Sequence, residues 1–150
     1  MENIKLIVSE VDGILTDGTV PIDELGYTSN KSFFVGDFEE INQLKKKVDV
    51  VFISSDNQIS YHLFRRKNIP FYWAKKDKFG TLLDVLRKYS VTAEEVVFIG
   101  AFLSDVKCAT MVPNSFCPLG SNIKLSNICT SLSVPSGKGV LTDLYLRFFQ

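Results

Sequence analysis

Short runs of hydrophobic residues recur along the chain, separated by longer stretches in which apolar residues return every three or four positions. The short runs are rich in β-branched residues, which is typical of strands, and the longer stretches have the period of helices. The predicted strands are Ile4–Ser9, Val48–Ile53, Pro70–Trp73, Val96–Ile99, Ser115–Cys117 and a weak one near Ile128. The predicted helices are approximately Phe38–Lys47, Ile59–Lys67, Lys78–Tyr89, Ser104–Met111 and Val140–Phe149. This alternation predicts an α/β fold with a mostly parallel sheet.

One segment, residues 18–34, interrupts the alternation. It has the pattern of two short strands about a polar turn that contains Gly26, so we expect a small β-hairpin inserted after the first strand. Its exposed apolar residues are too many for a hairpin that faces water alone. They are Val20, Ile22, Tyr27, Phe33 and Phe34. We expect further copies of the chain to cover them in a homo-oligomer, a tetramer built through this hairpin. The alternative is that the hairpin folds onto its own domain.

Length and charge narrow the classes of function. The 150 residues are enough for one domain with its own core, so we expect a single domain over 1–150. Seventeen basic residues balance seventeen acidic ones, which argues against nucleic acid or an anionic membrane as a partner. The basic runs Lys45–Lys47 and Arg65–Lys67 each close a predicted helix, where positive charge favours the helix dipole without any ligand.

The cysteines and the start of the chain indicate a compartment. Cys108, Cys117 and Cys129 are odd in number and lack CxxC spacing, which suits reduced thiols better than disulfides or a zinc site. The opening residues MENIKLIVSEVDG are unlike a secretory signal, and no stretch approaches the roughly 20 apolar residues of a membrane span. We therefore expect a cytoplasmic protein.

Polar residues that can perform chemistry follow the predicted strands. Ligands of an open parallel sheet bind beyond the carboxyl ends of the strands, so these residues are expected to converge. They are Glu10 and Asp12 after the first strand, Ser54, Ser55 and Asp56 after the second, Lys78 at the start of a helix, and Asp105 after the fourth strand. Carboxylates, hydroxyls and an ammonium are the groups that phosphoryl transfer requires. These residues therefore predict a site for a small phosphate ester.

These motifs, in this order, resemble those of the haloacid dehalogenase superfamily. The segments that carry the resemblance are EVDGILTDG, ISS, a lysine that opens a helix, and GAFLSD. The short hairpin in place of a large cap, the FFVGD segment and the Gly137-Lys138-Gly139 loop are similar to the 3-deoxy-manno-octulosonate 8-phosphate phosphatases. The resemblance covers essentially the whole chain. It implies a Rossmann-like three-layer sandwich with a small β-hairpin insertion.

The resemblance also implies roles for individual residues. Such phosphatases attack phosphorus with an aspartate at the position of Glu10 and use the carboxylate at Asp12 as general acid and base. Ser54, with Ser55 beside it, and Lys78 match the groups that bind the phosphate. The implied cofactor is magnesium, for which Glu10, Asp12 and Asp105 are the candidate ligands in this chain.

Three departures from the family pattern bear on activity. Glu10 is one methylene longer than aspartate, which moves the carboxylate by up to about 1.5 Å, and a misplacement of roughly 1 Å can cost about a hundredfold in rate. Ala101 stands where the family has a metal-binding aspartate, and magnesium tolerates imperfect coordination poorly. Asp56 stands where these phosphatases usually place an arginine, so we expect it to repel an anionic substrate.

Three hypotheses follow. The first is a catalytically impaired or inactive homologue of a sugar-acid-phosphate phosphatase that serves a structural, binding or regulatory role. The second is an active magnesium-dependent phosphatase of a sugar-acid phosphate, such as 3-deoxy-manno-octulosonate 8-phosphate or a nonulosonate 9-phosphate. The third is a module that binds a phosphorylated sugar through Ser54, Lys78 and backbone donors. Phosphate release, measured with and without reversion of the changed residues, separates them.

Overall fold

Six parallel strands form the central sheet of the protein, whose computed structural model describes residues 1–150. The strands are β1 (Leu6–Glu10), β2 (Asp49–Ser54), β3 (Phe71–Trp73), β4 (Val96–Ile99), β5 (Asn114–Leu119) and β6 (Thr130–Pro135). Their order is β3-β2-β1-β4-β5-β6, and every neighbouring pair is parallel. Strands are added outward from β1 on one side and from β4 on the other, so the direction of the strand order reverses between β1 and β4. In such sheets, ligands bind at the carboxyl ends of the strands where the order reverses.

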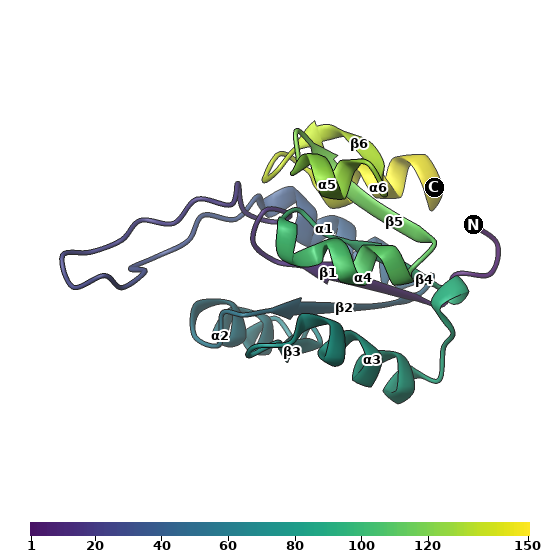
Figure 1. Ribbon diagram of the computed structural model, residues 1–150, viewed down its shortest axis with the longest axis horizontal. Coiled ribbons are helices and arrows are strands. Elements are labelled where there is room, and N and C mark those ends of the chain that lie inside the picture. Colours follow the sequence, from purple (N-terminus) through teal and green to yellow (C-terminus); the bar gives the residue numbers. More distant parts are fainter.

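Helices cover both faces of the sheet (Figure 1). They are α1 (Val35–Leu44), α2 (Ile59–Arg66), α3 (Lys78–Tyr89), α4 (Val106–Met111), α5 (Ile123–Ser126) and α6 (Val140–Phe148). Buried residues of α1, α2 and α6 belong to one hydrophobic cluster, and those of α3, α4 and α5 belong to a second. The predicted three-layer α/β fold is therefore confirmed. No helix combines the length and the apolar character needed to span a membrane.

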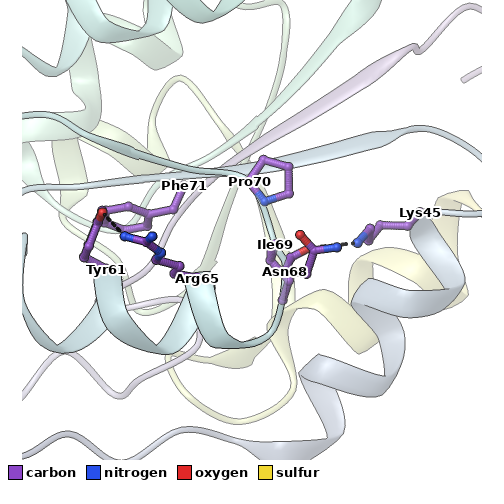
Figure 2. A pocket seen from close by; sticks show the side chains of 7 residues that line it. All are labelled: Lys45, Tyr61, Arg65, Asn68, Ile69, Pro70 and Phe71. Atoms are coloured by element: carbon purple, nitrogen blue, oxygen red, sulfur yellow. Dashed lines mark hydrogen bonds between the residues drawn. The ribbon is translucent and has the colours of Figure 1, made fainter.

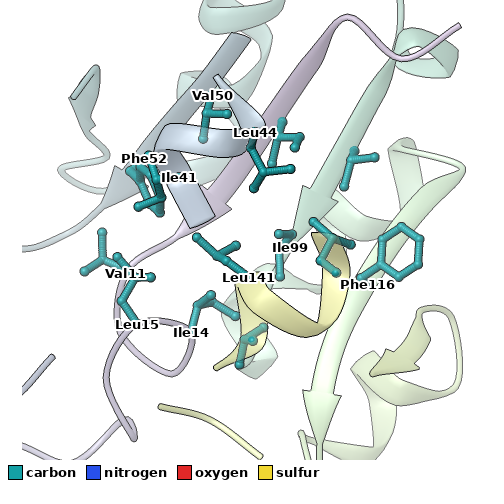
Figure 3. Close-up of a cluster of buried hydrophobic side chains, with 14 of the residues drawn as sticks. Val11, Ile14, Leu15, Ile41, Leu44, Val50, Phe52, Ile99, Phe116 and Leu141 are labelled. Atoms are coloured by element: carbon teal, nitrogen blue, oxygen red, sulfur yellow. The ribbon is translucent and has the colours of Figure 1, made fainter. Parts of the chain in front are cut away.

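The core is divided by the sheet because side chains of a strand point alternately to its two faces. In β1, Ile7 belongs to the cluster under α1, α2 and α6, whereas Leu6 and Val8 belong to the opposite cluster. Figure 3 shows the first cluster, in which Leu141 of α6 packs with strand residues such as Ile99. Because β1 is buried on both faces, the backbone of its last residue, Glu10, is held firmly at the edge of the site.

The segment after β5 differs from the prediction. The weak strand expected near Ile128 is β6, which begins only at Thr130, and the four-residue helix α5 before it was not predicted. In β6, an edge strand, Leu132 is buried and Val134 is partly buried, while its other residues are exposed or nearly so. So sparse an apolar pattern gives little periodic signal, and Ile128 lies in the turn between the two elements.

The segment 18–34, which we call the arm, projects far from the sheet (Figure 1). It turns back on itself at Gly26, whose φ of +83° favours glycine, as the sequence predicted. The expectation of two short strands was wrong, because a single antiparallel bridge, Ile22 with Thr28, joins the two sides. Pro21 cannot donate a ladder hydrogen bond, and the sides have no third strand beside them. Phe33, at the base, packs against the core rather than facing solvent.

Candidate functional site

The structure brings three of the predicted site residues into direct contact. Glu10 ends β1, Lys78 begins α3, and Asp105 ends a 3-10 turn, Leu103–Asp105, that follows β4. Lys78 Nζ lies 2.5 Å from Glu10 Oε2 and 2.5 Å from Asp105 Oδ1. It also donates a hydrogen bond to Ser104 Oγ at 3.2 Å. A single ammonium thus links the ends of β1 and β4 to the start of α3.

Lys78 is held in this position from its own helix. Asp77, the residue before α3, accepts a hydrogen bond from the Gly80 amide at 2.9 Å and caps the helix. Burial by itself lowers the pKa of Lys78, but the carboxylates of Glu10 and Asp105 reverse that effect and raise the pKa above its usual range. Lys78 therefore remains an ammonium at physiological pH.

Glu10 is almost fully buried and turns back towards its own backbone. Its Oε1 accepts a hydrogen bond from the Val11 amide at 3.2 Å, while Oε2 faces Lys78. Burial raises the pKa of Glu10 to about 7, against the opposing attraction of Lys78. Both carboxylate oxygens are therefore engaged within the protein, and near neutral pH the group is divided between its charged and neutral forms.

Asp105 is anchored on both of its oxygens. Its Oδ2 accepts hydrogen bonds from the amides of Ala101 at 2.8 Å and Phe102 at 2.9 Å, and its Oδ1 faces Lys78. The side chain is fully buried. Asp105 therefore shapes the loop after β4 and pairs with the lysine, so both of its oxygens already have partners within the protein.

Asp12 belongs to a second group of charges, which includes a residue that the sequence did not single out. Lys31, at the base of the arm, places Nζ 2.8 Å from Asp12 Oδ2 and 2.7 Å from Asp56 Oδ2, and its side chain is only 5 % exposed. Burial lowers the pKa of Lys31, but the hydrogen bonds to the two aspartates raise it above its usual range. Lys31 thereby fastens the arm to the carboxyl ends of both β1 and β2.

Asp56 has a partner that the sequence did not predict. It is paired with Lys31 and lies at the start of α2, where it accepts hydrogen bonds from the amides of Gln58 at 2.8 Å and Ser60 at 3.0 Å. Burial alone would raise its pKa, and these donors, with Lys31, bring the pKa down to about 2. Asp56 therefore stays ionised and shares a single ammonium with Asp12.

The two predicted phosphate-binding serines lie at the end of β2. Ser54 is fully buried, and its Oγ accepts a hydrogen bond from the Asp56 amide at 3.1 Å, which leaves the hydroxyl proton available. Ser55 is exposed, and its carbonyl accepts a hydrogen bond from the Trp73 indole at 3.0 Å. Ser55 lines two adjoining cavities, one beside Lys78 and one beside Asp12. It connects the two groups of charges.

The residues present do not fit the magnesium that the family resemblance implies. Each expected ligand contacts a lysine, and nowhere in the chain do three His, Cys, Asp or Glu side chains form a group that could hold a metal ion. A Cβ placed on Gly13 would lie 2.6 Å from Ala101 Cβ and 2.9 Å from Phe102 Cζ. The methyl group and the aromatic ring thus pack directly on the backbone beside Asp12.

A separate cavity of about 490 Å³ lies at the other end of α2, beside the first residue of β3 (Figure 2). Its two cationic side chains already have partners, because Arg65 donates to the Tyr61 hydroxyl at 3.0 Å and Lys45 to the Asn68 backbone carbonyl at 3.4 Å. None of the predicted site residues lines it. The candidate site remains the carboxyl edge of the sheet.

The strand order is that of a Rossmann-like α/β fold, and the residues at its carboxyl edge occur in the order of the motifs of the haloacid dehalogenase superfamily. No protein-family model matches the chain. It is 30% identical over 148 residues to the 3-deoxy-D-manno-octulosonate 8-phosphate phosphatase KdsC of Haemophilus influenzae, covering 96% of this chain and 82% of that protein. The chain therefore belongs to the family of 3-deoxy-D-manno-octulosonate 8-phosphate phosphatases, as its motifs predicted.

Solved structures agree with this assignment. A cobalt-bound form of the Haemophilus influenzae phosphatase superposes with a TM-score of 0.87 at 30% identity, over 95% of this chain and 85% of that one. The Moraxella catarrhalis phosphatase, in complex with magnesium, phosphate and KDO, shares the fold with a TM-score of 0.81 at 21% identity, over 95% and 83% of the two chains. The first of these relatives thus binds cobalt and the second binds magnesium.

Proposed function

We propose that this chain binds a phosphate ester at the carboxyl edge of its sheet without hydrolysing it, and so serves a binding, structural or regulatory role. One observation carries the proposal: Lys78 lies between Glu10 and Asp105 at 2.5 Å from each, while Ala101 stands at the position of a metal-binding aspartate and packs with Phe102 against Gly13. A divalent ion therefore lacks the set of free oxygen ligands that it requires.

The position of Glu10 supports the loss of turnover independently. A nucleophilic carboxylate must direct a free lone pair at phosphorus with the reacting atoms roughly 3–3.5 Å apart. Here one oxygen accepts from the Val11 amide and the other faces Lys78. The longer side chain therefore makes internal contacts where a nucleophile would have to face its substrate.

Binding requires fewer groups, and these are retained. Lys78 keeps its positive charge, Ser55 is exposed beside it, and the Ser54 hydroxyl has a proton to donate. Phosphate oxygens accept hydrogen bonds from such donors and are attracted by a lysine. Affinity for a phosphate group without its hydrolysis is the behaviour that this set of residues favours.

A structural role is supported by the arm. Leu25 is 76% exposed and Ile22 57%, and neither contacts the core. We propose that other copies of the chain cover these residues in a homotetramer. We also propose the cytoplasm as its compartment, with support from the three free cysteines, since thiols stay reduced there.

A phosphate-release assay tests the loss of turnover. The native chain, with magnesium and a panel that includes neutral sugar phosphates as well as 3-deoxy-manno-octulosonate 8-phosphate and a nonulosonate 9-phosphate, is expected to release no phosphate above the blank. The double reversion Glu10→Asp with Ala101→Asp restores the shorter carboxylate and a metal ligand, and is expected to raise the rate by at least about a hundredfold. Magnesium-dependent turnover by the native chain would identify an active phosphatase and refute the proposal.

A matched control separates restored chemistry from contamination. Adding Asp12→Asn to the double reversion removes the general acid and base and is expected to abolish the recovered activity. Recovered activity that survives this third substitution would come from another protein in the sample.

A further inference from the structure

A cavity of about 470 Å³ opens beside Asp12, between the arm and the start of α2. It adjoins the cavity beside Lys78 at Ser55, which lines both. A phosphate held by Lys78 and Ser55 would therefore direct the rest of its ester past Asp12 into this space. The chemistry of the cavity wall then selects the organic part of the ligand.

The charged side chains of this wall are Asp12, Asp56 and Lys31. The lysine is the single cation, and it is already bound by both carboxylates, at 2.8 Å from Asp12 and 2.7 Å from Asp56. The wall thus carries one more negative than positive charge. A carboxylate on the ligand would have to compete with two fixed carboxylates for one ammonium that is 5 % exposed.

The remaining polar groups of the wall are uncharged. They include the amides of Asn57 and Gln58 and the hydroxyls of Tyr27, Thr28 and Ser55. Amides and hydroxyls can both donate and accept hydrogen bonds, which matches the hydroxyl groups of a polyol. A wall of this composition favours several neutral hydroxyls over a second anionic group.

We propose that the organic part of the ligand is a neutral polyhydroxylated chain or sugar, and that Asp56 and Lys31 together exclude sugar acids. The inference rests on the proposed binding of a phosphate ester at the same site. It assigns Asp56 a selective role: the side chain withdraws Lys31 from the ligand and leaves the cavity with a net negative charge.

Two six-carbon phosphates that differ at one end test the proposal. D-Glucitol 6-phosphate carries a hydroxymethyl group at the carbon where 6-phosphogluconate carries a carboxylate. Calorimetric titration of the native chain at pH 7.5 is expected to give at least tenfold tighter binding of D-glucitol 6-phosphate. Asp56→Asn removes the excess negative charge while it keeps an oxygen at the start of α2, and is expected to reduce this preference to threefold or less. Asp84→Asn, an exposed substitution on α3, is the matched control and is expected to leave the preference unchanged.

Each result has a defined meaning. Equal or tighter binding of 6-phosphogluconate by the native chain overturns the exclusion of sugar acids and leaves the proposed phosphate binding intact. A preference that Asp56→Asn does not reduce overturns the role of Asp56. If neither compound nor inorganic phosphate binds, the proposed function itself is refuted, and the inference falls with it.

Discussion

At the scale of single residues, Glu10 makes the stability of the protein depend on pH. Its pKa is raised from 4.5 to about 7, chiefly by burial. Since the folded pKa lies above the unfolded one, the stabilising contribution is fully present below about pH 4.5 and is lost as the pH rises through 7. Between pH 5 and pH 8 the loss due to Glu10 is about 2 kcal/mol. Urea unfolding of the native chain and of Glu10→Gln should show this difference, because the amide does not titrate.

A comparison with an exposed acid makes the test specific. Glu39 lies on the surface of α1, and Glu39→Gln is expected to keep the pH dependence of the native chain. Part of the slope remains in Glu10→Gln, because burial also raises the pKa of Asp37, to about 6. Identical slopes for Glu10→Gln and the native chain would mean that Glu10 is not the titrating group.

The sequence predicted which residues reach the site better than it predicted their partners. The structure has Glu10 and Ser54 at the carboxyl ends of strands and Lys78 at the start of a helix, as their positions in the sequence predicted. The Lys31 contacts were not predictable in this way, because the residue lies 19 positions from Asp12 in a segment without periodicity. For the same reason the pairing of Asp56 was not predicted, since its lysine approaches from a distant part of the chain.

At the scale of elements, one buried carboxylate joins α1 to α6. Asp37 Oδ1 accepts hydrogen bonds from the amides of Leu141 at 3.1 Å and Thr142 at 3.2 Å, and so caps a helix more than a hundred residues away. Asp37→Ala leaves these buried donors without an acceptor and is expected to lower the free energy of unfolding by about 2 kcal/mol. Chemical denaturation at pH 7 measures the change.

The isosteric variant identifies the cause. Asp37→Asn retains an oxygen for the two amides and removes the cost of a buried charge, so its stability should stay within about 1 kcal/mol of the native value. A loss as large as that of Asp37→Ala would show that packing of the carboxylate, rather than its hydrogen bonds, joins the helices. The sequence could not predict this cap, because it lies inside α1 and serves another helix.

Elements with strong periodicity were predicted well, and short or edge elements were not. The strands β1, β2 and β4 were predicted from continuous apolar runs, which are typical of strands buried on both faces. The helix α5 has only four residues and β6 has one buried apolar position, so neither has a pattern that distinguishes it from a loop. The arm has the composition of strands but lacks a neighbouring strand to complete a sheet.

At the scale of the whole molecule, the arm predicts assembly. Ile22 and Leu25 lie near its tip with 57% and 76% of their surface exposed. Covering such residues is favourable by about 25 cal/mol for each Å² of apolar surface removed from water, and in a closed assembly every copy gains this contribution. Light scattering of the native chain at micromolar concentration is expected to give about four times the 16.9 kDa mass of one copy.

The variant Ile22→Asp with Leu25→Asp is expected to lower that mass to one or two copies, because it places a charge where the apolar contact forms. Neither position contributes to the core, so the circular dichroism spectrum should be unchanged. Ile123→Asp is the matched control, since Ile123 is 68% exposed and its helix, α5, lies away from the tip of the projecting arm (Figure 1), and it should leave the mass unaltered. A native chain that is monomeric at this concentration would contradict assembly through the arm, and a large assembly that survives the double substitution would place its contact elsewhere.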